Sequence, residues 1–266
     1  MKHSLRALTL VAALAACEAP FYDTILRGGQ VLDGTGAPAR ETDVAILGGR
    51  IAAIGDLSRA EAETAIDARG LYVSPGFIDT HSHAGPGLAT AERSHGEPLL
   101  AQGLTTVVVN PDGGGPVDLD EQRAALEADG LGVNVAQLVP HGSVRGRVIG
   151  SEDRAPSDEE LDTMRGLVRA GMEAGAWGLS SGTFYTPGSY SENSELVELG
   201  RVVAEFGGLY TSHIRDESNY TIGVVAAVEE VIEVGREAGI TAVVTHIKAL
   251  GPPVWGASAE IVARIS

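Results

Sequence analysis

The sequence predicts an α/β protein: a parallel (β/α)8 barrel of the TIM type, of which about six βα units are present, preceded by a small β-sandwich-type module. Three observations lead to this prediction. Apolar, β-rich runs alternate with amphipathic segments at a nearly regular spacing, glycines precede most of these runs, and no phosphate-binding glycine loop follows any of them. An open, doubly wound sheet would carry such a loop, so its absence favours the barrel.

The composition is that of a globular protein with 266 residues, of which 44% are hydrophobic and 21% charged. Nineteen Lys and Arg against 36 Asp and Glu give a formal charge of −17, a field that repels phosphate backbones. We therefore expect no nucleic-acid partner. The single cysteine excludes an internal disulfide framework.

Residues 1–16 are predicted to be a secretory signal, with Lys2 and Arg6 before an apolar run at 7–16 that is too short to span a bilayer as a mature helix. The segment LAAC at 14–17 resembles the bacterial lipobox, in which the cysteine is acylated after cleavage. The alternative is a plain signal peptide, with Cys17 incidental. Both predict an exported protein: the lipobox predicts one anchored to the membrane by a lipid on Cys17, and the plain signal peptide predicts a periplasmic one.

Residues 17–72 are predicted to form the small β domain. Glycine pairs interrupt short alternating segments, and Gly48-Gly49 is a two-residue hairpin signal because such turns need positive φ. Strands are expected at 25–26, 30–33, 43–47, 50–54 and 63–68.

Residues 73–266 are predicted to form the barrel, and the starts of its expected strands lie 32, 28, 43, 33 and 32 residues apart. A glycine before a strand can end the preceding helix in the left-handed conformation. The strands are expected at 73–80, 105–110, 133–139, 176–181, 209–212 and 241–245, and the capping glycines at Gly103, Gly130 or Gly132, Gly175, Gly207-Gly208 and Gly239.

Two of the intervening helices have clear signals. Ser157 and Glu160 form a capping box before an apolar stripe, and residues 221–239 repeat apolar positions at helical period. A complete barrel needs roughly 250 residues. Residues 73–266 supply fewer, so the sequence predicts a truncated barrel that stops inside its sixth unit.

Histidines stand at the ends of three predicted strands, where barrel enzymes place their sites. His81 and His83 follow the first strand, one residue apart, and the strand period of two places both imidazoles on one face. His213 and His246 close the fifth and sixth strands. Neutral imidazole is a good zinc ligand. We therefore predict a site for one or two divalent metals, with Asp112, just past the second strand, as a bridging carboxylate.

The alternative is that these are structural histidines satisfied by hydrogen bonds. His141 ends the third strand and is expected near the site without touching the metal.

Four motifs carry a resemblance to a known family: GFIDTHSH at 76–83, GLSSG at 178–182 with YTPG at 185–188, YTSHIRDE at 210–217, and HIK at 246–248. The first resembles the first-strand motif of the metal-dependent amidohydrolase superfamily. Together they resemble the N-acyl-D-amino-acid deacylase (D-aminoacylase) branch, from about residue 24 onward.

The resemblance implies that His81 and His83 bind one metal, usually zinc, and that His213 and His246 bind the other. Related deacylases carry a bridging cysteine where this sequence has Asp112, a departure that leaves metal identity and occupancy open. The catalytic aspartate of the family follows the eighth strand. That strand is absent from this sequence, so no catalytic residue is assigned.

Three further residues are predicted to contact substrate, each with an alternative. Tyr185 is expected to donate a hydrogen bond or simply to pack in its loop. Arg215 is expected to grip a carboxylate or to pair with Asp216 or Glu217. Lys248 is expected to contact substrate or to extend into solvent.

The predicted function is metal-dependent hydrolysis of a linear amide C–N bond by metal-activated water, with a small-molecule N-acyl amino acid as substrate. The fourth strand lacks the lysine that the hydantoinase branch carboxylates. The alternatives are a catalytically incomplete fragment, or an amidohydrolase acting on a cyclic amide or a dipeptide.

Overall fold

The structure, a computed structural model, describes residues 19–266. The predicted signal and Cys17 lie outside the described residues. The chain divides into two compact units at the boundary between Pro75 and Gly76, and each unit has apolar clusters of its own. No helix in residues 19–266 is both long and apolar enough to cross a bilayer.

The first unit is one mixed sheet with the strand order β3-β2-β1-β4, in which β5 also pairs with β1. The hairpin turn between β2 and β3 is Gly48-Gly49, and both residues have positive φ, as predicted. The strands are β1 (Phe21–Val31), β2 (Arg40–Leu47), β3 (Arg50–Gly55), β4 (Glu61–Asp67) and β5 (Tyr72–Val73).

The predicted β module is therefore present, as a single sheet rather than two facing sheets within the described residues. Its buried cluster consists of Ile25, Ala45 and Ala60. Most side chains of β3 and β4 are exposed, among them the apolar Ile51, Ile54 and Ile66, so no second layer of the described residues covers them.

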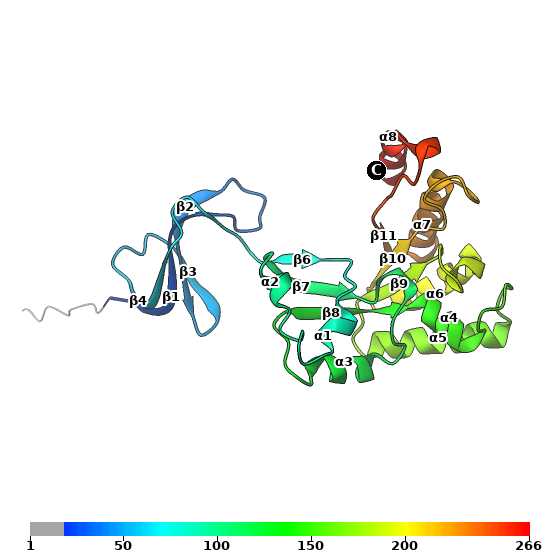
Figure 1. Ribbon diagram of the computed structural model, residues 1–266, viewed down its shortest axis with the longest axis horizontal. Helices are drawn as coiled ribbons and strands as arrows, with labels where there is room; N and C mark the ends of the chain where they lie inside the picture. Colours follow the sequence, from blue (N-terminus) through cyan, green and yellow to red (C-terminus); the bar gives the residue numbers. More distant parts are fainter. Residues whose placement is uncertain (1–18) are drawn as a thin grey trace, which may run out of the picture. The chain divides into compact units, whose positions relative to one another are not determined.

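The second unit is built on six parallel strands that neighbour one another in chain order, β11-β10-β9-β8-β7-β6 (Figure 1). This confirms the predicted succession of βα units. The strands are β6 (Phe77–Asp79), β7 (Leu104–Val109), β8 (Asn134–Pro140), β9 (Gly178–Gly182), β10 (Leu209–His213) and β11 (Thr241–Val244).

One predicted strand is divided between the units. Val73 pairs with Val31 in the first sheet, and the barrel strand begins only at Phe77. Pro75 lies between them, and it lacks the N–H that a continuous strand would need for its ladder.

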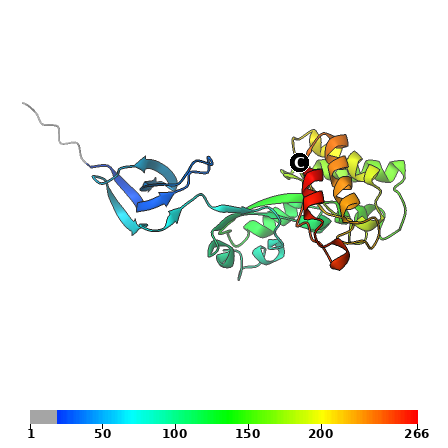
Figure 2. The ribbon, with the colours of Figure 1, turned by 90° about the horizontal axis from the view of Figure 1, so that it is seen from above.

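Helices α3 to α6 gather along one side of the parallel sheet in Figure 1, and α7 and α8 lie beside each other in Figure 2. The helices are α1 (Gly85–Leu88), α2 (Glu97–Leu100), η1 (Pro111–Gly113), α3 (Leu119–Glu127), α4 (His141–Val148), α5 (Asp158–Glu173), η2 (Gly188–Tyr190), α6 (Asn193–Ala204), α7 (Val224–Ala238), η3 (Pro252–Val254) and α8 (Ser258–Ile265).

The helix termini agree with the sequence signals. The Ser157 and Glu160 side chains form both hydrogen bonds of the capping box at the start of α5. The predicted left-handed glycines have positive φ before every later strand of the sheet: Gly103, Gly130, Gly175, Gly207 and Gly239. The main core lies between strands β8 to β10 and helices α4 to α8, with Leu179, Leu199 and Val228 fully buried. This packing fixes the end of β10, which carries His213.

Candidate metal centre

The four predicted histidines lie at the carboxyl ends of the parallel strands. His213 is the last residue of β10, and His246 follows β11 with a positive φ of 29°. His81 and His83 follow β6, which ends at Asp79, so the segment after the strand and not the strand itself directs their rings. The Asp79 carboxylate accepts the backbone N–H of His81 and holds the start of this segment.

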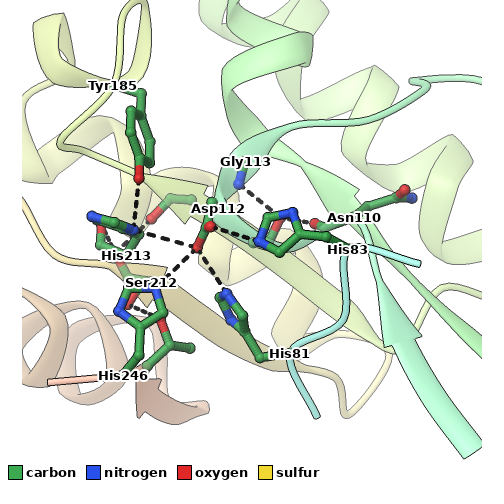
Figure 3. A network of polar contacts seen from close by, with 12 residues as sticks. His81, His83, Asn110, Asp112, Gly113, Tyr185, Ser212, His213 and His246 are labelled. Atoms are coloured by element: carbon green, nitrogen blue, oxygen red, sulfur yellow. Dashed lines mark hydrogen bonds and ion pairs between the residues drawn. The ribbon is translucent and has the colours of Figure 1, made fainter. Parts of the chain in front are cut away.

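All four imidazoles surround the carboxylate of Asp112 (Figure 3). Oδ1 of Asp112 lies 3.4 Å from Nε2 of His81, 3.6 Å from Nδ1 of His213 and 3.5 Å from Nε2 of His246. Oδ2 lies 3.3 Å from Nε2 of His83. The structure thus brings together the five predicted metal ligands, with the carboxylate in the middle.

These nitrogen–oxygen distances match the spacing of ligands around one ion. Two atoms bound tetrahedrally to zinc at about 2.1 Å lie about 3.4 Å apart, whereas N–H···O hydrogen bonds are usually shorter, at about 2.9 Å. Oδ1 of Asp112 is buried and has no aligned hydrogen-bond partner in the described part of the chain. Both observations fit a site built for a cation.

Two groups of donors could each hold one ion. In each group the ligand atoms lie within 4.8 Å of one another, and Asp112 belongs to both. The side chain of His213 is only 1% exposed, whereas that of His83 is 69% exposed, so the two positions differ in solvent access. The groups are His81, His83 and Asp112, and Asp112, His213 and His246.

The backbone around Asp112 takes an unusual path. Asn110 and Asp112 both have positive φ, a conformation that Asn and Asp tolerate better than other non-glycine residues. The Asn110 amide donates to the Leu138 carbonyl and to Gln122, and Ser180 Oγ both donates to the Asn110 carbonyl and accepts the Gly113 N–H. These hydrogen bonds attach the loop after β7 to strands β8 and β9.

Gly182 in β9 lets this loop approach closely. A Cβ at this position would lie 2.2 Å from the Asp112 carbonyl oxygen, so no larger residue fits without moving the loop. The GLSSG motif therefore supplies both a hydroxyl and a gap for the Asp112 loop.

The electrostatics of the centre favour the protonation states of a metal site. Burial raises the pKa of the Asp112 carboxyl, but hydrogen bonds and charge from His213 and His81 outweigh burial, so the net pKa is well below its usual range. Burial lowers the pKa of His246, and the charges of His213 and Lys248 lower it further. An ionised carboxylate and a neutral imidazole are the forms that bind metal.

Glu217 belongs to the same cluster and was not among the predicted site residues. Its Oε1 lies 3.3 Å from Nε2 of His213, 3.5 Å from Nδ1 of His246 and 3.2 Å from Nζ of Lys248. The only sequence signal is its position four residues after His213, within a run of three charged residues.

Tyr185 and Lys248 lie at the edge of the centre. The Tyr185 hydroxyl is 3.3 Å from Nδ1 of His213, and burial and the Asp112 charge raise its pKa, so it stays protonated. Lys248 is half-exposed and pairs with Glu217 rather than extending freely into solvent. Their predicted contacts with substrate stay predictions.

Arg215 makes structural contacts, and its predicted contact with a substrate carboxylate stays a prediction. Its guanidinium pairs with Glu230 and donates to the carbonyls of Ser189 and Ser191. The predicted alternative partners were wrong, because Asp216 turns inward to accept backbone N–H groups of the following loop and Glu217 pairs with Lys248.

His141 is fully buried away from the four ligands. Its Nε2 lies 2.7 Å from Oε1 of Glu195, which also pairs with the buried Arg145. Its described partner is Glu195 and not one of the predicted metal ligands, so it joins α4 to α6 instead of lying beside the site.

A cavity of about 840 Å³ opens beside the centre. His83, Asp112 and Tyr185 form the wall on the side of the metal ligands, and the remaining wall is mostly glycine, proline and alanine. Glu121 and Asp112 are its carboxylates, and no Lys or Arg of the described residues lines it.

Comparison with known proteins finds similar sequences, among them an aminoacylase and a deacylase. D-aminoacylase of Alcaligenes xylosoxydans xylosoxydans is 38% identical over 264 residues, which cover 90% of this chain and 53% of the relative. N-acyl-D-glutamate deacylase of the same organism is 42% identical over 265 residues, covering 91% and 53%. The chain therefore spans about half the length of the curated relatives it matches.

Solved structures agree with this similarity. The crystal structure of N-acyl-D-glutamate deacylase from Bordetella bronchiseptica, complexed with zinc and a phosphonate that mimics the tetrahedral intermediate, matches with a TM-score of 0.84 at 39% identity. The match covers 92% of this chain and 55% of that one. A crystal structure of D-aminoacylase matches with a TM-score of 0.83 at 36% identity, with the same coverage of both chains.

A sequence model of the amidohydrolase family matches residues 64–260, most of the parallel sheet and its helices. This span contains Asp112 and the four histidines around it. The chain belongs to the amidohydrolase family.

Proposed function

We propose that this chain forms the metal centre of a zinc-dependent hydrolase that removes the acyl group from N-acyl-D-amino acids. The observation that carries the proposal is the set of four imidazole nitrogens 3.3 to 3.6 Å from one carboxylate. The similarity to D-aminoacylase and N-acyl-D-glutamate deacylase supports the substrate class.

His81, His83, Asp112, His213 and His246 would hold the metal. When bound, a divalent ion polarises the amide carbonyl and lowers the pKa of water to about 7. Asp112 contributes a negative charge to both ion positions and keeps it because its pKa is lowered. As a hard oxygen ligand at the place of a thiolate in related deacylases, it widens the range of ions that the site accepts.

Tyr185 and Lys248 would orient the substrate. The protonated Tyr185 hydroxyl faces the centre and can donate a hydrogen bond to the amide or its acyl oxygen. The cavity beside the centre is mostly apolar and suits the acyl chain of the substrate. Asp112 and Glu121 in its wall would repel the carboxylate of the amino acid. Lys248, outside the cavity wall, is the cation placed to attract the carboxylate of the amino acid.

The test combines metal content and stereochemistry. The purified chain, stripped of metal and reloaded with zinc, is expected to bind one or two ions. A protein that combines this chain with the strand carrying the family's catalytic aspartate is expected to release the amino acid from N-acetyl-D-amino acids, but not from the L enantiomers. A chain that binds no zinc after loading, or whose hydrolysis is indifferent to chelators or to configuration, would contradict the proposal.

We also propose that the protein is exported, with Cys17 as its lipid-bearing residue. The support is the basic, apolar and small-residue pattern of residues 1–17.

A further inference from the structure

The buried carboxylate of Glu217 faces the ring nitrogens of two proposed ligands, on the side away from Asp112. His213 directs Nδ1 toward Asp112 and Nε2 toward Glu217, while His246 directs Nε2 toward Asp112 and Nδ1 toward Glu217. The two rings therefore lie between the same pair of carboxylates, in opposite orientations.

The nitrogens on the Glu217 side have no other acceptor. Nε2 of His213, Nδ1 of His246 and Oε1 of Glu217 are all buried, and within residues 19–266 none has an aligned hydrogen-bond partner. Each ring nitrogen nevertheless lies within 3.5 Å of that one oxygen. A neutral imidazole carries one N–H, which a carboxylate attracts.

The position of Glu217 is itself fixed. Its backbone carbonyl accepts the N–H of Leu250, and its side chain is only 5% exposed. The neighbouring Asp216 holds the loop by accepting the N–H groups of Ser218, Thr221 and Gly223. The main chain that carries this carboxylate is thus fixed by hydrogen bonds on both sides of Glu217.

A third cation site at Glu217 is a poor alternative. The Lys248 ammonium lies 3.2 Å from Oε1, so a positive charge is already paired with this carboxylate and would repel a metal ion there. The three nitrogens around Oε1 are all potential donors, an arrangement that suits an acceptor and not a metal ligand.

We propose that Glu217 is a positioning residue that keeps the N–H of His213 on Nε2 and the N–H of His246 on Nδ1. This leaves Nδ1 of His213 and Nε2 of His246 unprotonated toward Asp112. The inference deepens the proposed function and rests on it, because these are the nitrogens that would bind metal. Partners of this kind usually contribute 10- to 100-fold, roughly, to metal affinity.

The first measurement uses the metal-free chain and does not depend on turnover. Nitrogen-15 NMR of the imidazoles is expected to show the Nε2–H tautomer for His213 and the Nδ1–H tautomer for His246. In Glu217→Gln, which keeps the shape but loses the charge, both rings are expected to become tautomeric mixtures. Unchanged tautomers in Glu217→Gln, or the opposite tautomers in the wild type, would overturn the inference.

The second measurement is zinc affinity by competition with a chromophoric chelator. Glu217→Gln is expected to weaken zinc binding about 10- to 100-fold. Glu230→Gln is the matched control, because it removes a glutamate that pairs with Arg215 and touches no imidazole; its zinc affinity is expected to stay within about twofold. Equal affinity of Glu217→Gln and the wild type would reject the inference.

Circular dichroism checks that each variant folds. If Glu217→Gln does not fold, Glu217→Asp withdraws the carboxylate by one methylene while keeping its charge, and it should weaken zinc binding measurably. A wild type that binds no zinc would defeat the proposed function, whereas the tautomers of the metal-free chain would still decide the role of Glu217.

Discussion

The imidazole rings of His81 and His246 meet edge to face, with their centroids 4.7 Å apart. The strands that precede them, β6 and β11, are the two outermost strands of the six-stranded sheet. In a flat sheet with strands about 4.8 Å apart, these two strands would be separated by roughly 24 Å. The sheet must therefore curve strongly, and this curvature gathers the metal donors.

Replacing Asp112 should disable both ion positions. Asp112→Ala removes the ligand shared by both donor groups. Removing a residue that only orients a metal ligand lowers metal affinity by up to about 100-fold, so removing the ligand itself should lower zinc affinity by more than that. Isothermal titration with zinc measures this loss, and the exposed Asp129→Asn serves as the control. Asp112→Cys should restore zinc binding and shift preference toward soft ions such as Cd²⁺ relative to Mn²⁺.

Removing the Arg215 side chain should affect stability and leave the metal site intact. Arg215→Met loses an ion pair to Glu230 and two carbonyl contacts in a mostly buried place, which should lower the free energy of unfolding by about 1–3 kcal/mol. Urea denaturation measures the change. Weaker binding of an N-acyl amino acid at unchanged stability would instead restore the role first predicted for Arg215.

Glu195 should be among the most sensitive positions of the core. Glu195→Ala leaves the fully buried Arg145 without its carboxylate and His141 without its partner, so the free energy of unfolding should fall by about 3–5 kcal/mol. Chemical denaturation monitored by fluorescence gives this value. A loss below about 1 kcal/mol would mean that water replaces the carboxylate.

The start of α5 should be weakened by acid. Hydrogen bonds from Arg154, and then from the Ser157 backbone, lower the pKa of Glu160 from 4.5 to about 2. A carboxyl group whose pKa is lower in the folded state than in the unfolded state contributes its full stabilisation at pH values above the unfolded-state pKa. This contribution is lost as the pH falls toward the folded-state pKa. Glu160→Gln should therefore melt below the wild type near neutral pH, and the difference should shrink between about pH 4.5 and about pH 2. A difference that is constant across this range would assign the effect to side-chain shape alone.

Cys17 should determine membrane attachment. In a bacterial host supplied with radiolabelled palmitate, the wild type should carry label and sediment with membranes, whereas Cys17→Ser should do neither. Export of an unlabelled wild type would favour the plain signal peptide, and label in Cys17→Ser would show that the lipid is attached elsewhere.

The fold and the ligands could be predicted because both follow from short-range patterns. Parallel strands bring their carboxyl ends to one edge, so His213 and His246, 33 residues apart, had to lie near each other once the strands were identified. The glycine at 239 marked the helix end between them, and it has the left-handed φ that the sequence predicted.

The partners of charged residues could not be predicted in the same way. Arg215, Asp216 and Glu217 are consecutive, and their order does not say which way each side chain turns. The path of the loop sends Arg215 toward α7, Asp216 into its own backbone and Glu217 toward the histidines. Such choices depend on three-dimensional packing that a local pattern does not contain.

The distribution of the donors along the chain also affects folding. Asp112 and His246 are separated by more than one hundred residues and four intervening strand pairings, so the donor set of Asp112, His213 and His246 is complete only when β7 to β11 have all paired. Such non-local contacts form slowly. A cation that binds here with high affinity will thus select chains whose sheet is fully assembled, and the moment of its capture will mark the end of folding for this part of the molecule.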